Sequence, residues 1–307
     1  MRAIALCICA ALLAGCGSAA PFFGGSESGA AALAAARTGA ANDALLYVAN
    51  NTGSGGDEVY VYALSSGKLV QTLAGLPGVG GLCTDVANDV FVPMNTSEAI
   101  REYRHGGKNP VATLVDPKGL PVDCSVDPTT GDLAVVSDCT PYTCDYGNVA
   151  IYTAARGKPK YNSPSNMQNE YNCGYDDLGD LFVAGMTPGA FALAELPRQG
   201  KKFVPISNEQ PIGFPGGVKW VGKHLLIADA EKNVVYQFDI RGRVAKRVGT
   251  IQLLDMKHVE GYSISNDTLY AADANGLDVA FYHYPAGGKP FKKIYGFDDP
   301  ISTAVSL

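Results

Sequence analysis

Cys139 and Cys144 are two residues whose type and spacing suggest covalent chemistry. They flank the tetrapeptide TPYT in a single loop of the 307-residue chain, so their thiols are close enough to close a small ring. Thiols pair in oxidising compartments, and an exported protein is expected to form disulfides wherever the geometry allows them. We therefore expect a Cys139–Cys144 disulfide, with two free surface thiols as the alternative.

The elements that must position such side chains belong to a unit that recurs along the chain. A short apolar phrase appears as LYVAN from Leu46, VFVPM from Val90, LAVVSD from Leu133, LFVAG from Leu181, LLIAD from Leu225 and LYAAD from Leu269. Successive phrases begin 44, 43, 48, 44 and 44 residues apart. A glycine followed by a basic residue keeps step with them, from Gly67-Lys68 to Gly288-Lys289. A period of roughly 20 to 50 residues is typical of repeat architectures.

Each unit has the pattern of four short strands. A strand such as EVYVYAL or NVVYQFDI lies between the two markers, and its Val, Ile, Tyr and Phe residues fit a pleated, half-buried surface. Four strands per unit without helical periodicity are typical of a propeller blade. The first unit lacks an innermost strand, whereas the chain ends in DPISTAVSL, which has the character of one. We therefore predict an all-β fold, a six-bladed β-propeller with four-stranded blades over residues 44–307, in which the C-terminal strand closes the first blade.

Three further cysteines, Cys83, Cys124 and Cys173, fall at nearly the same place on the predicted innermost strands of three successive blades. Crowding near the axis requires a small residue there, and cysteine behaves as a small hydrophobe. A buried structural role is therefore the favoured interpretation. A disulfide between two neighbours is the next alternative. A three-thiolate metal site is disfavoured, because equivalent side chains point the same way around the ring.

The recurring phrases resemble the repeats of known families. LYVAN, LLIAD and LYAAD, each following a turn such as DPTTGD, resemble the NHL-type and YVTN-type propeller repeats of exported bacterial proteins. The resemblance covers residues 45–307. It implies the fold and leaves the function open, because these residues form the scaffold.

Enzymes of this architecture, such as the gluconolactonase-like group and the streptogramin lyases, bind a divalent metal in the central channel. The resemblance implies that Glu170 and Asn172 in NEYNCGYD, with His258 and Glu260 in KHVEGYS, would be the ligands here. Oxygen ligands suit Ca²⁺ or Mg²⁺, and an imidazole widens the range. Since no motif forces the four side chains to converge, we expect no cofactor and no catalytic residues, with a divalent metal such as Ca²⁺ as the alternative.

The N-terminal residues indicate export. Arg2 precedes an apolar stretch over residues 3–15, which is typical of a signal peptide and shorter than the roughly 20 residues that span a bilayer. The sequence LAGC, ending at Cys16, resembles the lipobox of bacterial lipoproteins. That resemblance implies a diacylglycerol on Cys16, and an ordinary signal peptide with Cys16 unmodified is the alternative. Gly17 in place of Asp favours an outer-membrane address.

The predicted domains are therefore a signal peptide over residues 1–16, a tether over residues 17–43 and the propeller. The tether is rich in Gly, Ala and Ser, a composition typical of flexible linkers. The formal net charge is −6 and no basic cluster offsets it, which disfavours nucleic acid as a partner. No other apolar run is long enough for a transmembrane helix.

Two functions remain open at the level of the sequence. The favoured hypothesis is a lipid-anchored scaffold at the cell envelope that binds a protein, peptide or glycan through its loops and is not an enzyme. Trp220 and the TPYT loop are its expected contact points, with a core position for Trp220 as an equal alternative. The second hypothesis is a metal-dependent hydrolase or lyase, gluconolactonase-like or streptogramin-lyase-like, with its site at the central channel.

Overall fold

The structure is a computed structural model, and it describes residues 43–53 and 56–307. The predicted signal peptide, the lipidation site Cys16 and almost the whole predicted tether lie outside these residues. Within the described ranges, no helix has both the length and the apolar character needed to cross a membrane.

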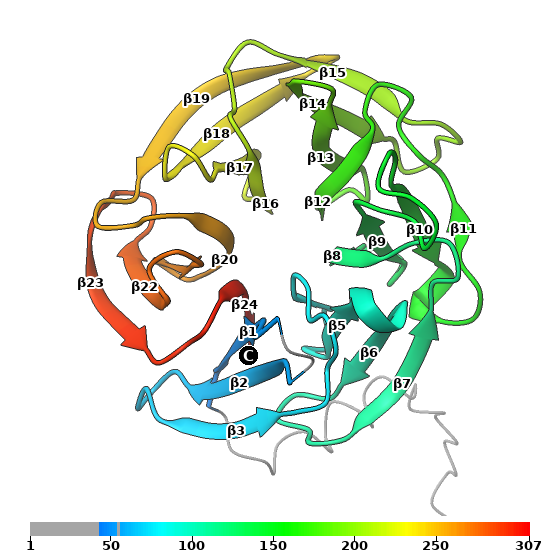
Figure 1. Cartoon of the computed structure of the whole chain (residues 1–307). Coiled ribbons are helices and arrows are strands. Elements are labelled where there is room, and N and C mark those ends of the chain that lie inside the picture. The colour runs from blue at the N-terminus through cyan, green and yellow to red at the C-terminus, as the bar shows by residue number, and fades with distance from the viewer. Residues whose placement is uncertain (1–42, 54–55) are drawn as a thin grey trace, which may run out of the picture. The chain divides into compact units, whose positions relative to one another are not determined.

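The described residues form strands almost throughout, and the sheets are arranged in a ring (Figure 1). The strands nearest the centre of the ring are β4 (Cys83–Thr84), β8 (Pro121–Val126), β12 (Asn169–Tyr175), β16 (Pro215–Val221), β20 (Val259–Ser265) and β24 (Pro300–Ser306). The next strands outward are β1 (Leu45–Asn50), β5 (Val90–Met94), β9 (Leu133–Ser137), β13 (Leu181–Thr187), β17 (His224–Asp229) and β21 (Thr268–Asp273). The all-β class predicted from the sequence is confirmed.

The outer half of the ring contains the remaining elements. The third strands are β2 (Glu58–Ala63), β6 (Ala99–Tyr103), β10 (Asn148–Tyr152), β14 (Ala190–Leu196), β18 (Val234–Arg241) and β22 (Asp278–His283). The outermost strands are β3 (Leu69–Leu73), β7 (Pro110–Val115), β11 (Lys160–Tyr161), β15 (Val204–Asn208), β19 (Val244–Gln252) and β23 (Gly287–Tyr295). Two short 3-10 helices, η1 (Asn95–Ser97) and η2 (Thr153–Ala155), follow β5 and β10.

Continuous pairing divides the ring into five sheets. Four of them have four antiparallel strands each, in the orders β24-β1-β2-β3, β4-β5-β6-β7, β8-β9-β10-β11 and β20-β21-β22-β23. The fifth has eight strands in the order β12-β13-β14-β15-β19-β18-β17-β16. Its two halves meet where the outermost strands β15 and β19 pair in parallel, Ser207 opposite Val244 and Asn208 opposite Ala245.

The predicted closure by the C-terminal strand is confirmed. β24 pairs antiparallel with β1, from Leu45 opposite Ser306 to Asn50 opposite Pro300. Asn50 is fully buried, and its side-chain oxygen accepts hydrogen bonds from the backbone N–H groups of Asp298 and Asp299 at 2.9 and 3.1 Å. Such closure removes the free sheet edges to which other chains could add.

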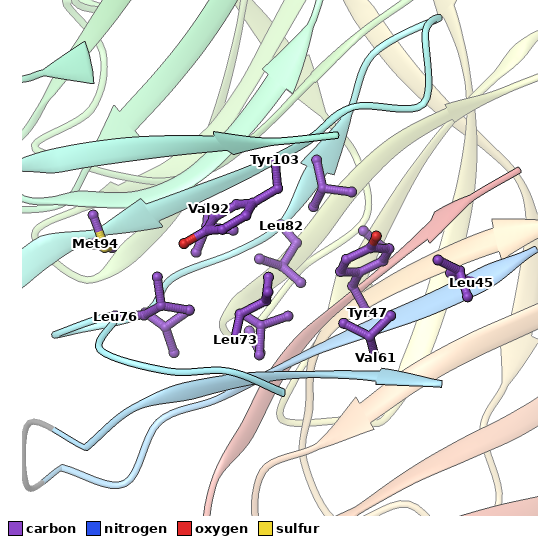
Figure 2. Close-up of a cluster of buried hydrophobic side chains, with 14 of the residues drawn as sticks. Leu45, Tyr47, Val61, Leu73, Leu76, Leu82, Val92, Met94 and Tyr103 are labelled. Carbon is purple, nitrogen blue, oxygen red and sulfur yellow. The ribbon is translucent and has the colours of Figure 1, made fainter. Parts of the chain in front are cut away.

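Buried hydrophobic side chains fill the spaces between neighbouring sheets. In one cluster, Tyr47 and Val61 from β1 and β2 pack against Val92 from β5 and Tyr103 from β6 (Figure 2). Clusters of the same kind lie between the other neighbouring groups of four strands, including the two halves of the eight-stranded sheet. Trp220 is partly buried and packs against one of them, with its ring stacked on Phe182 at 5.8 Å between centroids.

Two disulfides cross-link the described residues. Cys139–Cys144 confirms the prediction from the TPYT loop. Cys83 and Cys124 are buried, and they form the disulfide between neighbouring blades that was the next alternative, with 5.6 Å between their Cα atoms. The physical reason is a close approach of the innermost strands, where the N–H of Gly81 donates to the carbonyl of Val122 at 2.6 Å. A Cβ on the adjacent Gly80 would lie 2.7 Å from that carbonyl oxygen, so only glycine allows this spacing.

Cys173 is the free cysteine of the described residues, and it is buried. Its backbone N–H donates to the carboxylate of Asp123 at 3.1 Å. Burial raises the pKa of its thiol well above the ordinary range, which keeps the thiol protonated and unreactive. The predicted structural role is thus confirmed for Cys173.

Candidate functional site at the channel mouth and beside it

A small polar cavity lies at the centre of the ring. Its volume is about 190 Å³, and its lining comes mainly from the innermost strands and the residues just before them: Gly81, Val122, Asp123, Asp138, Tyr171, Asn172, Phe214, Gly217, Lys219, Glu260, Gly261, Tyr262, Ile301 and Ser302. Cavities that hold drug-sized ligands measure about 300–1,000 Å³. The central cavity is therefore large enough for an ion or a very small molecule only.

Asp123 is a buried acid in this lining. Burial raises the pKa of its carboxyl to about 6, and the charge of Lys219 opposes that rise. A Cβ on Gly81 would lie 2.2 Å from the Asp123 carboxylate, so the glycine leaves room for the acid between two inner strands. The lining of the cavity contains three acidic residues, Asp123, Asp138 and Glu260, and one basic residue, Lys219.

His258 and Glu260 form a pair near the same cavity. The Nε2 atom of His258 lies 3.0 Å from a carboxylate oxygen of Glu260. That hydrogen bond raises the pKa of His258. The backbone N–H of His258 donates to Asp273 on β21 at 2.9 Å, which holds the residue at the entrance of β20.

Asn172 and Glu170 point to different places. The amide group of Asn172 lines the central cavity and donates to the carbonyl of Pro215 at 3.1 Å. Glu170 lines a second cavity. The cause is a β-bulge: Glu170 lies opposite Gly185 and Asn172 opposite Ala184. Because neighbouring residues of a strand face opposite sides of the sheet, the bulge turns Glu170 and Asn172 to opposite sides.

The four residues predicted as metal ligands therefore do not line one cavity together. Asn172 and Glu260 line the central cavity, Glu170 lines the second one, and His258 lies beside Glu260. Among residues 43–53 and 56–307, no three His, Cys, Asp or Glu side chains are grouped closely enough to hold a metal ion. The four predicted ligands thus do not converge on one point.

The second cavity is larger and mostly apolar, with a volume of about 660 Å³. It is lined by Pro117, Lys118, Thr140, Tyr142, Tyr146, Gly147, Asn148, Tyr161, Ser163, Pro164, Met167, Gln168 and Glu170. These residues come from β10, β11 and β12 and from the loops that precede β8, β10 and β12. Its volume lies within the range of known ligand pockets.

The Cys139–Cys144 loop forms one wall of this second cavity. Within the loop, the hydroxyl of Thr140 accepts hydrogen bonds from the N–H groups of Tyr142 and Thr143. The side-chain amide of Asn169 donates to the carbonyls of Asp138 and Cys144 at 2.7 and 3.1 Å, which fixes the loop to β12. Tyr142 is 91% exposed and Tyr146 57% exposed. Tyr142 within the loop and Tyr146 just after it therefore expose their aromatic rings to solvent, where hydrophobic burial alone would not place them.

Glu170 lies at the floor of the same cavity. Burial raises the pKa of its carboxyl to about 8, and the nearby charge of Asp138 adds to the rise. A Cβ on Gly147 would lie 2.5 Å from its Oε2 atom, so the glycine leaves the space that the carboxyl occupies. The structure places Glu170, which the resemblance assigned to the central channel, at the second cavity. Asn148 and Tyr161 also line this cavity, and the sequence marks them only as members of predicted strands.

The ring resembles solved structures over most of its length. A chain of the nidogen/laminin complex superposes with a TM-score of 0.67 at 15% identity, covering 86% of this chain and 98% of that one. A protein of unknown function from Bacteroides caccae gives 0.62 at 12% identity, covering 86% and 99%. A streptogramin B lyase gives 0.53 at 10% identity, covering 82% and 73%.

The chain is a β-propeller. These identities are low, so the likeness shows the fold of the propeller alone. The sequence matches no family model and no curated protein. The two disulfides of the propeller are typical of proteins that reside outside the cytoplasm.

Proposed function

We propose that this propeller is an exported, lipid-anchored protein of the NHL/YVTN type that binds a ligand at the cell envelope and catalyses no reaction. The observation that carries the proposal is the cavity of about 660 Å³ beside the channel mouth, with the exposed Tyr142 in a disulfide-closed loop and the exposed Tyr146 just after it. A rigid scaffold that presents aromatic side chains in solvent suits recognition. The neighbour from the nidogen/laminin complex is itself part of a protein complex, which supports a binding role.

We further propose that the ring has six blades. Counting each half of the eight-stranded sheet as a blade supports this number, since the halves share only two parallel residue pairs. A hydrophobic cluster also packs between those halves, as between other neighbouring sheets. The first blade is then the one that β24 closes.

An enzymatic role is the alternative, and the streptogramin B lyase among the neighbours favours it. To separate the two, the purified chain should be assayed for lactone hydrolysis and for lyase turnover with Ca²⁺, Mg²⁺, Mn²⁺ or Zn²⁺ added, and again with a chelator. We expect no turnover above the rate without protein, because the ligand candidates Glu170 and Asn172 face different cavities. Turnover that a chelator abolishes and that Glu260→Gln also abolishes would overturn the proposal.

The proposed lipid anchor on Cys16 can be tested separately. In cells of the source organism or a bacterial host, Cys16→Ser should move the protein from the membrane fraction to the soluble fraction and abolish incorporation of labelled fatty acid. The reason is that the cysteine thiol of the lipobox-like LAGC sequence is the expected attachment point. Cys9→Ser, a change within the same apolar stretch, is the matched control and should leave both properties unchanged. Retention of the label in Cys16→Ser would contradict the lipoprotein assignment.

A further inference from the structure

The outermost strands of the ring differ in charge. β3, β7 and β15 contain no charged residue, and Lys160 is the charged residue of β11. β19 and β23 contain no acidic residue and five basic ones: Lys246, Arg247, Lys289, Lys292 and Lys293. Positive charge is therefore concentrated on two strands of a chain whose formal net charge is −6.

β19 and β23 together form one basic track along the rim. The N–H of Leu254, just after β19, donates to the carbonyl of Gly288 in β23 at 2.9 Å, and Leu253 forms a parallel bridge with the same glycine. Figure 1 shows the two strands following one another around the outside of the ring. Each has 9 residues, about 30 Å at roughly 3.3 Å per residue. The basic track is therefore long and curved.

Most of the positive charges on the basic track are not neutralised within the propeller. Lys293 pairs with Asp278 at 2.8 Å. The other four basic residues are exposed and make no ion pair with any residue that the structure describes. Two of them, Arg247 and Lys292, lie over aromatic rings, a contact that keeps their charge. A ligand with several negative charges along its length would be complementary to this surface.

The shape of the basic track distinguishes between polyanions. A flat bilayer surface touches only part of a convex rim, whereas a flexible chain can follow the rim around (Figure 1). The two disulfides are typical of proteins outside the cytoplasm. Acidic polysaccharides are ordinary components of cell surfaces, and nucleic acids are not. Shape and location therefore favour an acidic glycan chain.

Exposed aromatic rings on β23 fit the same kind of ligand. Phe291 is 52% exposed and Tyr295 69% exposed. The ring of Phe291 stacks on that of His283 with 4.6 Å between centroids, which fixes its orientation. Sugar rings have apolar C–H faces that can pack on flat aromatic side chains, whose large apolar area dominates many interfaces. A polyanion without such faces would leave these rings uncovered.

We propose that the basic track binds a linear acidic glycan, with its acidic groups on the four free basic side chains and its sugar rings against Phe291 and Tyr295. The cavity of about 660 Å³ is a separate site, because no residue of β19 or β23 lines it. The proposal therefore goes beyond the function proposed above. The acidic groups can be carboxylates or sulfates, and the probes below distinguish them.

Titration calorimetry of the purified full chain tests the proposal. The probes are a galacturonate oligomer of twelve units, a heparin fragment of the same length, a galacturonate dimer and a neutral dextran oligomer of twelve units. We expect both long acidic probes to bind, the dimer at least tenfold more weakly because it covers a small part of the basic track, and dextran not at all. The tighter of the two long probes identifies the acidic group.

Binding should also weaken with salt. Raising the NaCl concentration from 50 to 500 mM should weaken the long acidic probes at least tenfold. The reason is that the charges are exposed, and the Debye length falls from about 10 Å at 0.1 M to about 3 Å at 1 M. Binding that salt leaves unchanged would contradict recognition through the basic track.

A matched pair of charge reversals locates the site. Lys246→Glu combined with Arg247→Glu should weaken the long acidic probes at least tenfold. Lys158→Glu combined with Lys160→Glu, at exposed positions in and just before β11, changes the net charge equally and should weaken them less than threefold. Thermal unfolding of both variants should match that of the parent, because the replaced side chains are exposed.

The aromatic contact has its own variant. Tyr295→Ser should weaken the long acidic probes several-fold, because it removes a ring from the end of the basic track. The control Val115→Ser changes a residue of β7 that is 56% exposed, and it should have no effect.

Failure of both long acidic probes to bind would overturn the proposal, as would an equal loss of affinity in the two charge-reversed variants. Tighter binding of a DNA duplex, or of phosphatidylcholine vesicles with 30% phosphatidylglycerol, would also overturn it, because the partner would then be a nucleic acid or a membrane. None of these results concerns the cavity of about 660 Å³ or the turnover assay, so the proposed function is judged separately.

Discussion

Deletion of residues 300–307 is expected to abolish cooperative folding. β24 pairs with β1 along its whole length, and it also contacts other parts of the ring. Thr303 bonds to Ser263 on β20 at 2.8 Å, and Ser302 accepts a hydrogen bond from the N–H of Leu82 at 3.1 Å. At roughly 1 kcal/mol for each hydrogen bond, the lost bonds alone amount to about 5 kcal/mol or more, comparable with the roughly 5–15 kcal/mol that stabilise a typical domain.

Circular dichroism during thermal unfolding, together with size-exclusion chromatography, measures the effect of this deletion. The shortened chain should show a broad, non-cooperative transition and should self-associate, because the freed edge of β1 can pair with another molecule. Removal of Leu307 alone is the matched control, since this residue is 64% exposed, and it should change the unfolding free energy by less than about 1 kcal/mol. A sharp transition of the shortened chain within a few degrees of the parent would contradict ring closure as the source of stability.

The closure was predictable because it depends on a pattern that two separated segments share. The apolar runs in LLYVAN and ISTAVSL each indicate a strand. The first unit lacks an innermost strand, and the C-terminal segment supplies one. Turns were predictable for a similar reason, since DPTTGD contains its own hydrogen-bonding groups: Asp127 accepts from the N–H and the hydroxyl of Thr129, both at 2.7 Å.

The candidate site was less predictable than the fold, because the position of a single residue decides which cavity a side chain faces. The prediction placed Glu170 and Asn172 together, as strand alternation would. One extra residue in β12, Tyr171, breaks that alternation, and no simple sequence rule locates a bulge. Asn148 shows the same limit, since its side-chain amide donates to the carbonyl of Lys118, which is 30 residues away in the chain.

The Cys83–Cys124 disulfide was only an alternative at the level of the sequence. The sequence pattern places both cysteines on inner strands but does not give the distance between these strands. β4 is only two residues long, and the glycines before it let it approach β8 more closely than the average strand spacing implies.

Replacement of Cys83 and Cys124 together by alanine is the second change with a large expected effect. The disulfide closes a loop across 41 residues, and the chain-entropy relation assigns about 4 kcal/mol to a loop of that length. The loss should be larger than this figure, because both sulfur atoms are buried in the hydrophobic cluster between β5 and β9 and their removal leaves a cavity. The double variant is preferable to either single one, because a single variant leaves an unpaired thiol beside the strand that carries Cys173.

Cys139→Ala with Cys144→Ala is the matched control for that experiment. Its loop spans a separation of only 5 residues, so the same relation gives about 2 kcal/mol. Urea unfolding with and without a reducing agent measures both double variants, and reduction of the parent chain should reproduce the larger loss. If the variant that lacks Cys83 and Cys124 were more stable than the variant that lacks Cys139 and Cys144, the disulfide would not be what holds the short strand β4 against β8. The closeness of the inner strands would then have to come from the glycines and the backbone hydrogen bonds alone.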